Sequence, residues 1–291
     1  MKQIELSNFS ISNDKELTII GGMNVLESHS LAMQVAEHFK KVTEKLNLKW
    51  VFKASFDKAN RSSIDSFRGL GFEEGLKILE DISSTFDVPV LTDIHEKDQA
   101  IPVSEICEII QIPAFLCRQT DLIEAAAKTN KIIQFKKPQF LSAPDMRNVV
   151  TKCYGFGNEK VLLCERGNIF GYNNLVVDML NFDIMKSFDV PVVFDVTHSL
   201  QMPGGLGKST AGRREYLLQL ARAGISQKIA GLFLETHPNP DEAKCDGPCA
   251  LQLSLLEDFL LNIKDLDVFV KSQDDIQTCL LYTSPSPRDV H

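Results

Sequence analysis

The chain has 291 residues, 44% of them hydrophobic and 24% charged, so it can bury a large core as one α/β barrel or as two smaller domains. The net charge of −8 argues against nucleic acid as a partner, and any local basic cluster is therefore expected to bind a small anion. Seven scattered cysteines, the lack of a signal-peptide pattern and the lack of an apolar run of roughly 18 residues predict a cytoplasmic protein with no membrane partner.

Short apolar–polar alternation over residues 1–16 predicts an N-terminal β-hairpin. Eight strand-like runs then alternate with eight amphipathic segments. The strands are predicted at 17–20, 50–52, 88–91, 106–112, 131–135, 161–164, 190–196 and 229–234, and the helices at 29–46, 72–86, 98–104, 119–129, 142–152, 173–187, 209–225 and 249–264. This alternation, in about the ~250 residues typical of the fold, predicts a (β/α)₈ TIM barrel over 17–270. An open doubly wound sheet is the alternative.

Polar or glycine-rich residues follow every predicted strand. They lie at 21–24, 53, 92–95, 111, 136–137, 165–166, 195–198 and 235–237. In a barrel these ends meet on the C-terminal rim, where barrel enzymes place their chemistry. Four cations and four carboxylates would converge there: Lys53, Lys58, Lys136 and Arg166, with Asp93, Asp195, Glu235 and Asp246. The cations would repel one another unless a polyanionic ligand or these carboxylates offset them, so structural ion pairing is the competing interpretation.

The segment after the second strand is the densest anion-binding pattern in the chain. Lys53 and Lys58 offer ammonium groups, while Asn60, Arg61 and Ser62 offer directional hydrogen bonds to phosphate. The pattern predicts a site for phosphate or carboxylate groups. A solvated basic loop is the alternative.

Two further motifs suggest nucleotide or zinc binding and are rejected. The glycine-rich segment 204–210 lacks the first P-loop glycine, because Met202 occupies that position. We interpret it as a loop that covers a rim site, with Lys208 near a phosphate, or as a plain flexible loop. Cys245 and Cys249 lack the second pair of a zinc finger. His198, Glu235 and Asp246, in contrast, are expected to share one locus on the rim as three of the four ligands of a mononuclear metal site, with the fourth ligand left open.

With these residues assembled, the sequence resembles the 3-deoxy-D-manno-octulosonate 8-phosphate synthase family, also called 2-dehydro-3-deoxyphosphooctonate aldolases, which are (β/α)₈ enzymes of lipopolysaccharide-sugar (KDO) biosynthesis. The motifs are GGMNVLES at 21–28, FKASFDKANRSS at 52–63, QTD at 119–121, KKPQF at 136–140, FDVTH at 194–198 and KCDGP at 244–248. The resemblance covers residues 1 to about 270. The related heptulosonate-phosphate synthases share the fold but not this density of motifs.

The resemblance implies a transferase that condenses phosphoenolpyruvate with D-arabinose 5-phosphate and water, with no cofactor. By this resemblance phosphoenolpyruvate would be bound by Lys53, Gln111, Lys136, Gln139 and Arg166, and the pentose phosphate by Asn60, Arg61 and Ser62. Lys58 would act near both substrates, and Glu235 would belong to the binding set. Arg118 would reach the pentose phosphate from a neighbouring subunit of a homotetramer. His198 and Asp246 are the candidates for the base that activates water.

The resemblance also implies that no metal is needed. The family has a branch that binds a divalent ion through cysteine, histidine, glutamate and aspartate, and a branch without metal. Asn24, which we expect to be a catalytic residue, stands at the cysteine position. Cys249 replaces a small residue of the family. Residues 279–291 do not resemble the family's ending, and we expect a disordered or artefactual tail over 271–291. A non-catalytic sugar-phosphate sensor is the alternative function, disfavoured because binding alone does not require Lys58, His198 and Asp246.

Overall fold

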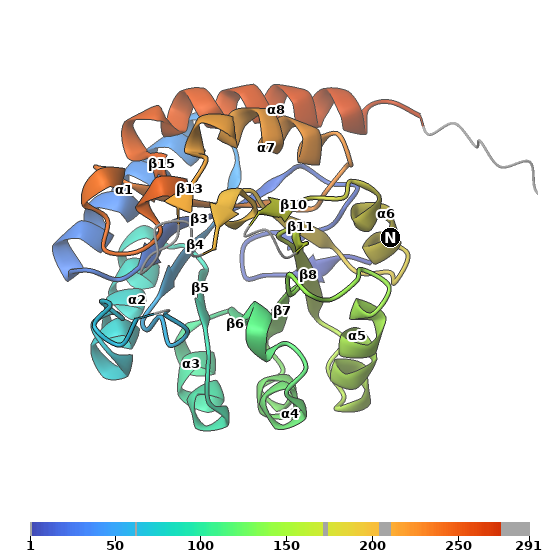
Figure 1. Ribbon diagram of the computed structural model, residues 1–291, viewed down its shortest axis with the longest axis horizontal. Coiled ribbons are helices and arrows are strands. Elements are labelled where there is room, and N and C mark those ends of the chain that lie inside the picture. The colour runs from blue at the N-terminus through green and yellow to red at the C-terminus, as the bar shows by residue number, and fades with distance from the viewer. Residues whose placement is uncertain (1, 62, 171–173, 204–210, 275–291) are drawn as a thin grey trace, which may run out of the picture.

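Eight parallel strands close into a barrel in the computed structural model, which describes residues 2–61, 63–170, 174–203 and 211–274 (Figure 1). The barrel strands are β3 (Thr18–Val25), β4 (Lys49–Ser55), β5 (Val90–Asp93), β6 (Ile109–Ile112), β7 (Ile132–Lys136), β8 (Val161–Glu165), β11 (Val192–Asp195) and β14 (Gly231–His237). The barrel closes where β11 pairs in parallel with β14, with Phe194 opposite Leu232. Every strand thus has two neighbours, which confirms the predicted (β/α)₈ barrel and excludes the open sheet.

Helices between the strands cover the outside of the barrel (Figure 1). They are α1 (His29–Lys45), α2 (Phe72–Phe86), α3 (Ala100–Ile106), α4 (Thr120–Lys128), α5 (Met146–Gly155), α6 (Leu180–Lys186), α7 (Leu217–Ile225) and α8 (Leu256–Lys271). Ser28 caps α1 by accepting a hydrogen bond from the Leu31 amide at 3.2 Å. In α2 the predicted stripe of Leu76, Leu79 and Ile82 is buried.

Three predicted helices are wrong at their starts, because the chain first forms short strands on the rim. Part of 173–187 is β10 (Leu175–Val176), which pairs with β9 (Asn168–Ile169). Part of 209–225 is β13 (Ala211–Gly212), which pairs with β12 (Gln201–Met202). Part of 249–264 is β15 (Leu251–Gln252), which extends β14. Pairing with a distant segment outweighs local helix propensity in these stretches. The expected loop at 204–210 and residues 275–291 of the expected tail lie outside the described residues.

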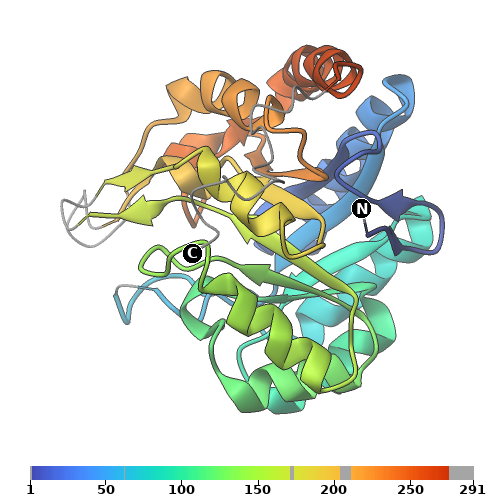
Figure 2. The ribbon, with the colours of Figure 1, turned by 90° about the vertical axis from the view of Figure 1, so that its right-hand side faces the viewer.

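The predicted N-terminal hairpin closes one end of the barrel. It consists of β1 (Ile4–Glu5) and β2 (Ser10–Ile11), which pair antiparallel. Ile4 and Ile11 pack on the apolar residues inside the barrel. In Figure 2 the hairpin (dark blue) and the β9–β10 pair (yellow-green) lie on opposite sides of the molecule. The hairpin therefore seals the floor and leaves the opposite rim for binding.

The barrel interior changes from apolar to polar along the strands. The apolar layer consists of Ile20, Val51, Leu91, Ile109, Ile132, Leu162, Val193 and Phe233. In seven of these strands, or just past the strand's end, a buried polar residue follows the apolar-layer residue by two or four positions. These polar residues are Lys53, Asp93, Gln111, Lys136, Arg166, Asp195 and Glu235. Since side chains of a strand alternate between its faces, these polar groups share the interior with the apolar layer. The polar layer therefore rests on an apolar floor.

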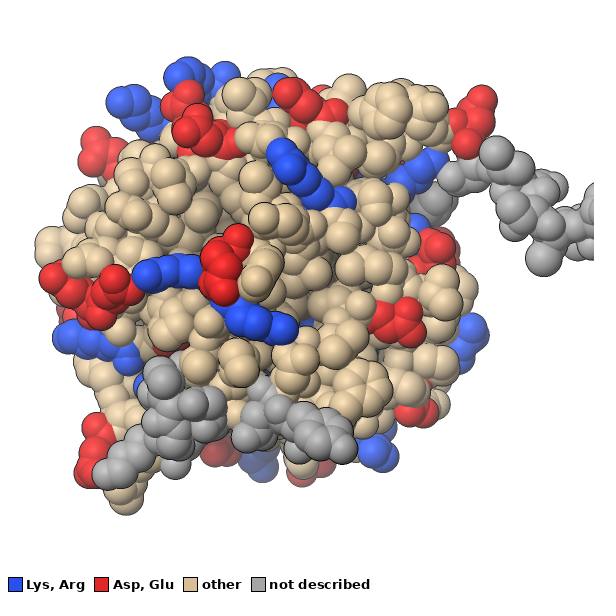
Figure 3. Space-filling view, turned by 45° about the horizontal axis from the view of Figure 1, so that its top comes forward, with Lys and Arg blue, Asp and Glu red and all other residues tan. Residues whose placement is uncertain are grey.

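The face shown in Figure 3 carries basic and acidic side chains that are interspersed and not segregated by sign. It offers no basic surface of the kind that binds nucleic acid. None of the helices within the described ranges is both long and apolar enough to cross a membrane.

Candidate active site

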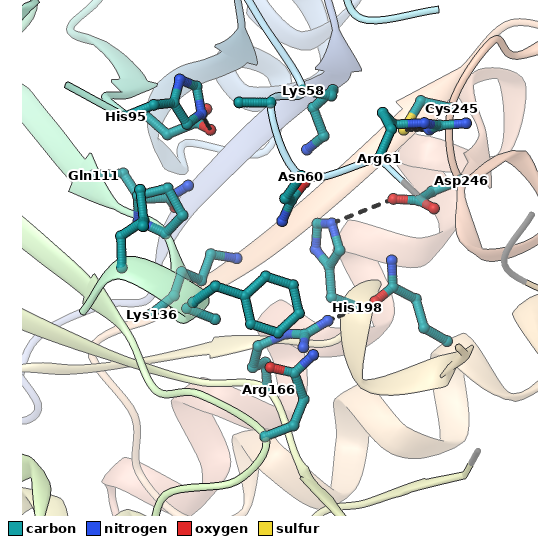
Figure 4. A pocket seen from close by; sticks show the side chains of 18 of the residues that line it. Lys58, Asn60, Arg61, His95, Gln111, Lys136, Arg166, His198, Cys245 and Asp246 are labelled. Atoms are coloured by element: carbon teal, nitrogen blue, oxygen red, sulfur yellow. Dashed lines mark hydrogen bonds and ion pairs between the residues drawn. The ribbon is translucent and has the colours of Figure 1, made fainter. Parts of the chain in front are cut away.

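A pocket of about 390 Å³ opens at the C-terminal ends of the barrel strands (Figure 4). The predicted residues that line it are Lys53, Lys58, Asn60, Arg61, Gln111, Lys136, Gln139, Arg166, His198 and Asp246. Asn24 and Glu235 are buried against lining residues. Ser62 lies outside the described residues, and Arg118 is exposed and does not line the pocket of its own chain. The fold thus gathers groups from seven barrel strands and their loops.

Lys53 and Glu235 form a buried ion pair below the pocket. The Lys53 ammonium lies 2.6 Å from Glu235 Oε1 and donates to the Asn24 carbonyl oxygen at 3.0 Å, and both side chains are 1% exposed. Burial raises the pKa of Glu235, but the neighbouring His198, Lys53 and Lys58 outweigh it and lower that pKa to about 2. Glu235 is therefore a carboxylate at neutral pH.

Asp195 orients two pocket residues. Its carboxylate accepts from the Lys136 ammonium and from His198 Nδ1, the latter at 2.7 Å. Burial raises the pKa of Asp195, but His198 and Lys136 outweigh it and hold the pKa well below its ordinary value. Because Nδ1 faces this carboxylate, a neutral His198 carries its proton on Nδ1. Its Nε2 atom lies on the pocket side, 3.4 Å from Glu235 Oε2 and 3.8 Å from Asp246 Oδ2.

Asn24 lies between the three candidate metal ligands. Its Nδ2 atom donates to Glu235 Oε2 at 2.5 Å and to Asp246 Oδ2 at 3.1 Å, and lies 3.4 Å from His198 Nε2. These two carboxylates use both amide hydrogens. The nitrogen of a side-chain amide does not bind metal ions. In the described part of the chain, His, Cys, Asp and Glu side chains form no group of three or more that could hold an ion. This arrangement does not fit a metal, because Asn24 takes the position between its ligands.

Lys58 is a permanent cation of the pocket. Burial lowers its pKa, but the carboxylates of Glu235, Asp93 and Asp246 outweigh this effect and raise the pKa overall. A lysine with a raised pKa is an ammonium group at neutral pH. Lys58 can therefore stabilise developing negative charge but cannot accept a proton.

Several pocket residues are absent from the predicted site, namely His95, Gln201 and Cys245. His95 Nε2 lies 3.0 Å from Asp93 Oδ2, Gln201 Oε1 accepts from Arg166 at 2.5 Å, and the Cys245 sulfur contacts Arg61. His95 belongs to the predicted polar strand end 92–95, and Cys245 directly precedes Asp246, so both positions could have been included from the sequence. Gln201 has no such signal, because it enters the pocket through the β12–β13 pairing.

Comparison with known proteins identifies the family. Residues 2–272 match the model of the DAHP synthetase I family. The chain belongs to this family. Relatives from Pseudomonas syringae pv. syringae (strain B728a), Pseudomonas aeruginosa (strain UCBPP-PA14) and Pseudomonas fluorescens (strain Pf0-1) are each named 2-dehydro-3-deoxyphosphooctonate aldolase. Each is 60% identical over 277 residues, which is 95% of this chain and 99% of the relative. The family predicted from the motifs is confirmed.

The carboxylates of this family member's pocket predict a loss of stability in acid. Glu235 has an ordinary pKa of 4.5, and its folded pKa is about 2. Unfolding in this range takes up a proton, so the free energy of unfolding should fall as the pH is lowered from about 4.5 toward 2. Asp93 and Asp195, whose pKa values are also held well below their ordinary 3.8, act in the same direction below that pH.

The midpoint of thermal unfolding, measured at pH values between about 6 and about 2.5, tests this expectation, because this range includes the pKa values of the three carboxylates in the unfolded chain. Glu235→Gln should show a shallower decrease below pH 4.5 than the unaltered chain, because the variant has no proton to take up at this position. A midpoint that stays constant or rises over this range would contradict the expectation.

Proposed function

We propose that the protein condenses phosphoenolpyruvate with D-arabinose 5-phosphate and water to give 3-deoxy-D-manno-octulosonate 8-phosphate and inorganic phosphate, in KDO biosynthesis. The observation that carries the proposal is the convergence of Lys58, Arg61, Lys136 and Arg166 on one pocket of a protein whose net charge is −8. Two anionic substrates would neutralise this cluster. The relatives at 60% identity are named 2-dehydro-3-deoxyphosphooctonate aldolase, which supports the same reaction.

We assign the two ends of the pocket to the two substrates. Phosphoenolpyruvate would bind Lys53, Gln111, Lys136, Gln139 and Arg166, which come from barrel strands and from the loops after β7 and β8. The supporting geometry is the Arg166 guanidinium, which donates to Gln201 Oε1 at 2.5 Å and is thereby held in the pocket. The arrangement supplies ammonium and guanidinium donors for a phosphate and a carboxylate.

The pentose phosphate would bind the loop after β4. Asn60 and Arg61 line the pocket from this loop, with Ser62, which lies outside the described residues, completing the proposed site. Lys58 lines the same pocket, and we assign its ammonium to the charge that develops on the sugar aldehyde oxygen. In the proposed reaction the enol carbon attacks this aldehyde, water adds at C2 of phosphoenolpyruvate, and the hemiketal phosphate releases phosphate by carbon–oxygen cleavage.

His198 and Asp246 are the proposed bases for the attacking water. Their Nε2 and Oδ2 atoms lie 3.8 Å apart, which the dashed line in Figure 4 marks. Asn24 donates to Asp246 and fixes this carboxylate beside the imidazole. A water that contacts both atoms from the pocket would find two acceptors, and Asp195 would stabilise the imidazolium that forms.

The direct test measures phosphate release with both substrates together and with each alone. Release that requires both supports the condensation. Binding of both substrates without release of inorganic phosphate would support the non-catalytic sensor instead.

Erythrose 4-phosphate should be used about 100-fold less efficiently than arabinose 5-phosphate, because a shorter sugar held by the same phosphate site misplaces its aldehyde by more than about 1 Å. Comparable use of the two sugars would favour the heptulosonate reaction.

Activity is expected to survive chelation, because Asn24 replaces the thiolate of the metal-binding branch. EDTA should leave phosphate release unchanged, whereas activity abolished by EDTA and restored by manganese would contradict the expectation.

Asn24→Cys should supply a thiolate beside His198, Glu235 and Asp246, and four such ligands bind zinc. Calorimetric titration with zinc should therefore detect binding to this variant and little binding to the unaltered chain.

We further propose a cytoplasmic homotetramer in which Arg118 reaches the pocket of a neighbouring subunit. The exposure of Arg118 outside its own pocket supports this arrangement. Sedimentation equilibrium of the purified chain measures the assembly directly.

A further inference from the structure

A buried ion pair lies directly behind the proposed phosphoenolpyruvate site. Lys136 and Arg166 line the pocket, while their chain neighbours Lys137 and Glu165 do not. Adjacent residues of an extended chain point to opposite faces, so Lys137 and Glu165 point away from the pocket. Both side chains are 0% exposed, and Lys137 Nζ lies 3.3 Å from Glu165 Oε1. The proposed mechanism uses neither residue.

Glu165 fixes the backbone that carries Arg166. Its Oε1 atom accepts hydrogen bonds from the amides of Arg166 at 2.8 Å and Gly167 at 2.6 Å. Gly167 has a φ of 85°, a left-handed conformation that favours glycine. Two successive amides that point at one carboxylate oxygen form a small anion site made of backbone. The direction in which Arg166 leaves the end of β8 therefore depends on this carboxylate.

Lys137 joins this turn to the loop after β7. Its ammonium donates to the carbonyl oxygens of Gly167 at 3.2 Å and Leu141 at 3.4 Å, and to Asn168 Oδ1 at 3.0 Å. Asn168 in turn donates to the Leu141 carbonyl at 3.1 Å. The ammonium thus holds the loops after β7 and β8 together from behind the pocket.

The same network reaches Gln139 and α6. The Ile169 amide donates to the Gln139 carbonyl at 2.9 Å, so β9 holds the backbone of this pocket residue. Asn181 at the start of α6 donates to Glu165 Oε2 at 3.0 Å. Both oxygens of Glu165 therefore have partners, as a buried carboxylate requires.

The stability of the fold does not by itself require a charged pair at positions 137 and 165. A buried ion pair is often no more stabilising than apolar side chains of the same volume, because both charges lose their hydration. An apolar pair, however, would leave the Arg166 and Gly167 amides without an acceptor. The distinctive property of this pair is the fixed geometry that it imposes on two pocket loops.

We infer that Lys137 and Glu165 are positioning residues that set the separation of Lys136, Gln139 and Arg166 for the phosphate of phosphoenolpyruvate. This inference rests on the proposed function. It predicts that the pair affects the KM for phosphoenolpyruvate and not the KM for the sugar phosphate, because none of the described residues of the loop that carries Asn60 and Arg61 takes part in the network.

Lys137→Met and Glu165→Gln test the inference. Each should raise the KM for phosphoenolpyruvate by about tenfold or more, because a small misplacement of binding groups weakens the site. The KM for arabinose 5-phosphate should change by no more than about twofold. Equal changes of both KM values, or no change of either, would overturn the positioning role.

Asp267→Asn is the matched control. Asp267 is also a buried carboxylate that accepts from a backbone amide, that of Leu17 at 3.0 Å, and pairs with Lys271 at 2.7 Å. This pair belongs to α8 and does not contact the pocket. Asp267→Asn should lower the thermal midpoint without changing either KM. If it raised the KM for phosphoenolpyruvate as Glu165→Gln does, general destabilisation would explain both results.

Asn181→Ser gives a milder test if the charged variants do not fold, since it removes one donor to Glu165 and leaves the ion pair intact. It should raise the KM for phosphoenolpyruvate by about threefold and leave that for the sugar unchanged. The unaltered chain is assayed first. An inactive unaltered chain would refute the proposed function, whereas an active one whose variants keep the KM for phosphoenolpyruvate would refute only the positioning role.

Discussion

Lys53→Met is expected to lower the free energy of unfolding by about 3–5 kcal/mol, because it leaves the buried carboxylate of Glu235 without its cation. The ammonium of Lys53 lies 2.6 Å from Glu235 Oε1 at a position that is 1% exposed. After the substitution the nearest remaining donor to this carboxylate is the neutral amide of Asn24. Urea unfolding followed by the fluorescence of Trp50, the single tryptophan, measures the change.

Two controls separate this effect from the loss of a lysine as such. Lys45→Met removes an exposed partner of Glu257 and should cost at most about 1 kcal/mol. The double variant Lys53→Met, Glu235→Leu leaves no unpaired charge and should recover much of the stability, but not the activity. A loss below about 1 kcal/mol in Lys53→Met would show that other groups neutralise Glu235.

Arg61→Ala is expected to reduce the use of arabinose 5-phosphate by about 10- to 150-fold, which corresponds to a charge-assisted contact of roughly 1.5–3 kcal/mol. Arg61 lines the pocket on the loop after β4, and its guanidinium contacts the Cys245 sulfur and, among the residues that the structure describes, no carboxylate. It is therefore available to bind a phosphate. Phosphoenolpyruvate, which is assigned to the other end of the pocket, should bind almost as before.

Calorimetry with each substrate alone distinguishes selective from general weakening. Arg222→Ala is the control, because Arg222 lies on α7 and donates to Asn262 at 2.6 Å outside the pocket. It should change neither affinity. Equal weakening of both substrates by Arg61→Ala would show that the assignment of this arginine to one phosphate is wrong.

The sequence determined the architecture because its signals are local. The β-prone runs, the amphipathic stripes and the polar strand ends can each be recognised within a few residues, and eight repeats of this pattern fit a closed barrel. Since parallel strands end at the same edge, the pattern also predicts that Lys53, Gln111, Lys136 and Arg166 meet on one rim. The pocket contains all four.

The tertiary structure decided which of two adjacent polar residues enters the pocket. Barrel strands are buried on both faces, so their apolar runs do not indicate which face is inside. Closure of the barrel directs Lys136 and Arg166 inward, and it leaves Lys137 and Glu165 to pair behind them. The Asn24 amide meets Glu235 and Asp246, which lie 211 and 222 residues further along the chain. The β12–β13 pair likewise brings in Gln201. Such contacts depend on closure of the whole barrel, because no short stretch of sequence contains both partners.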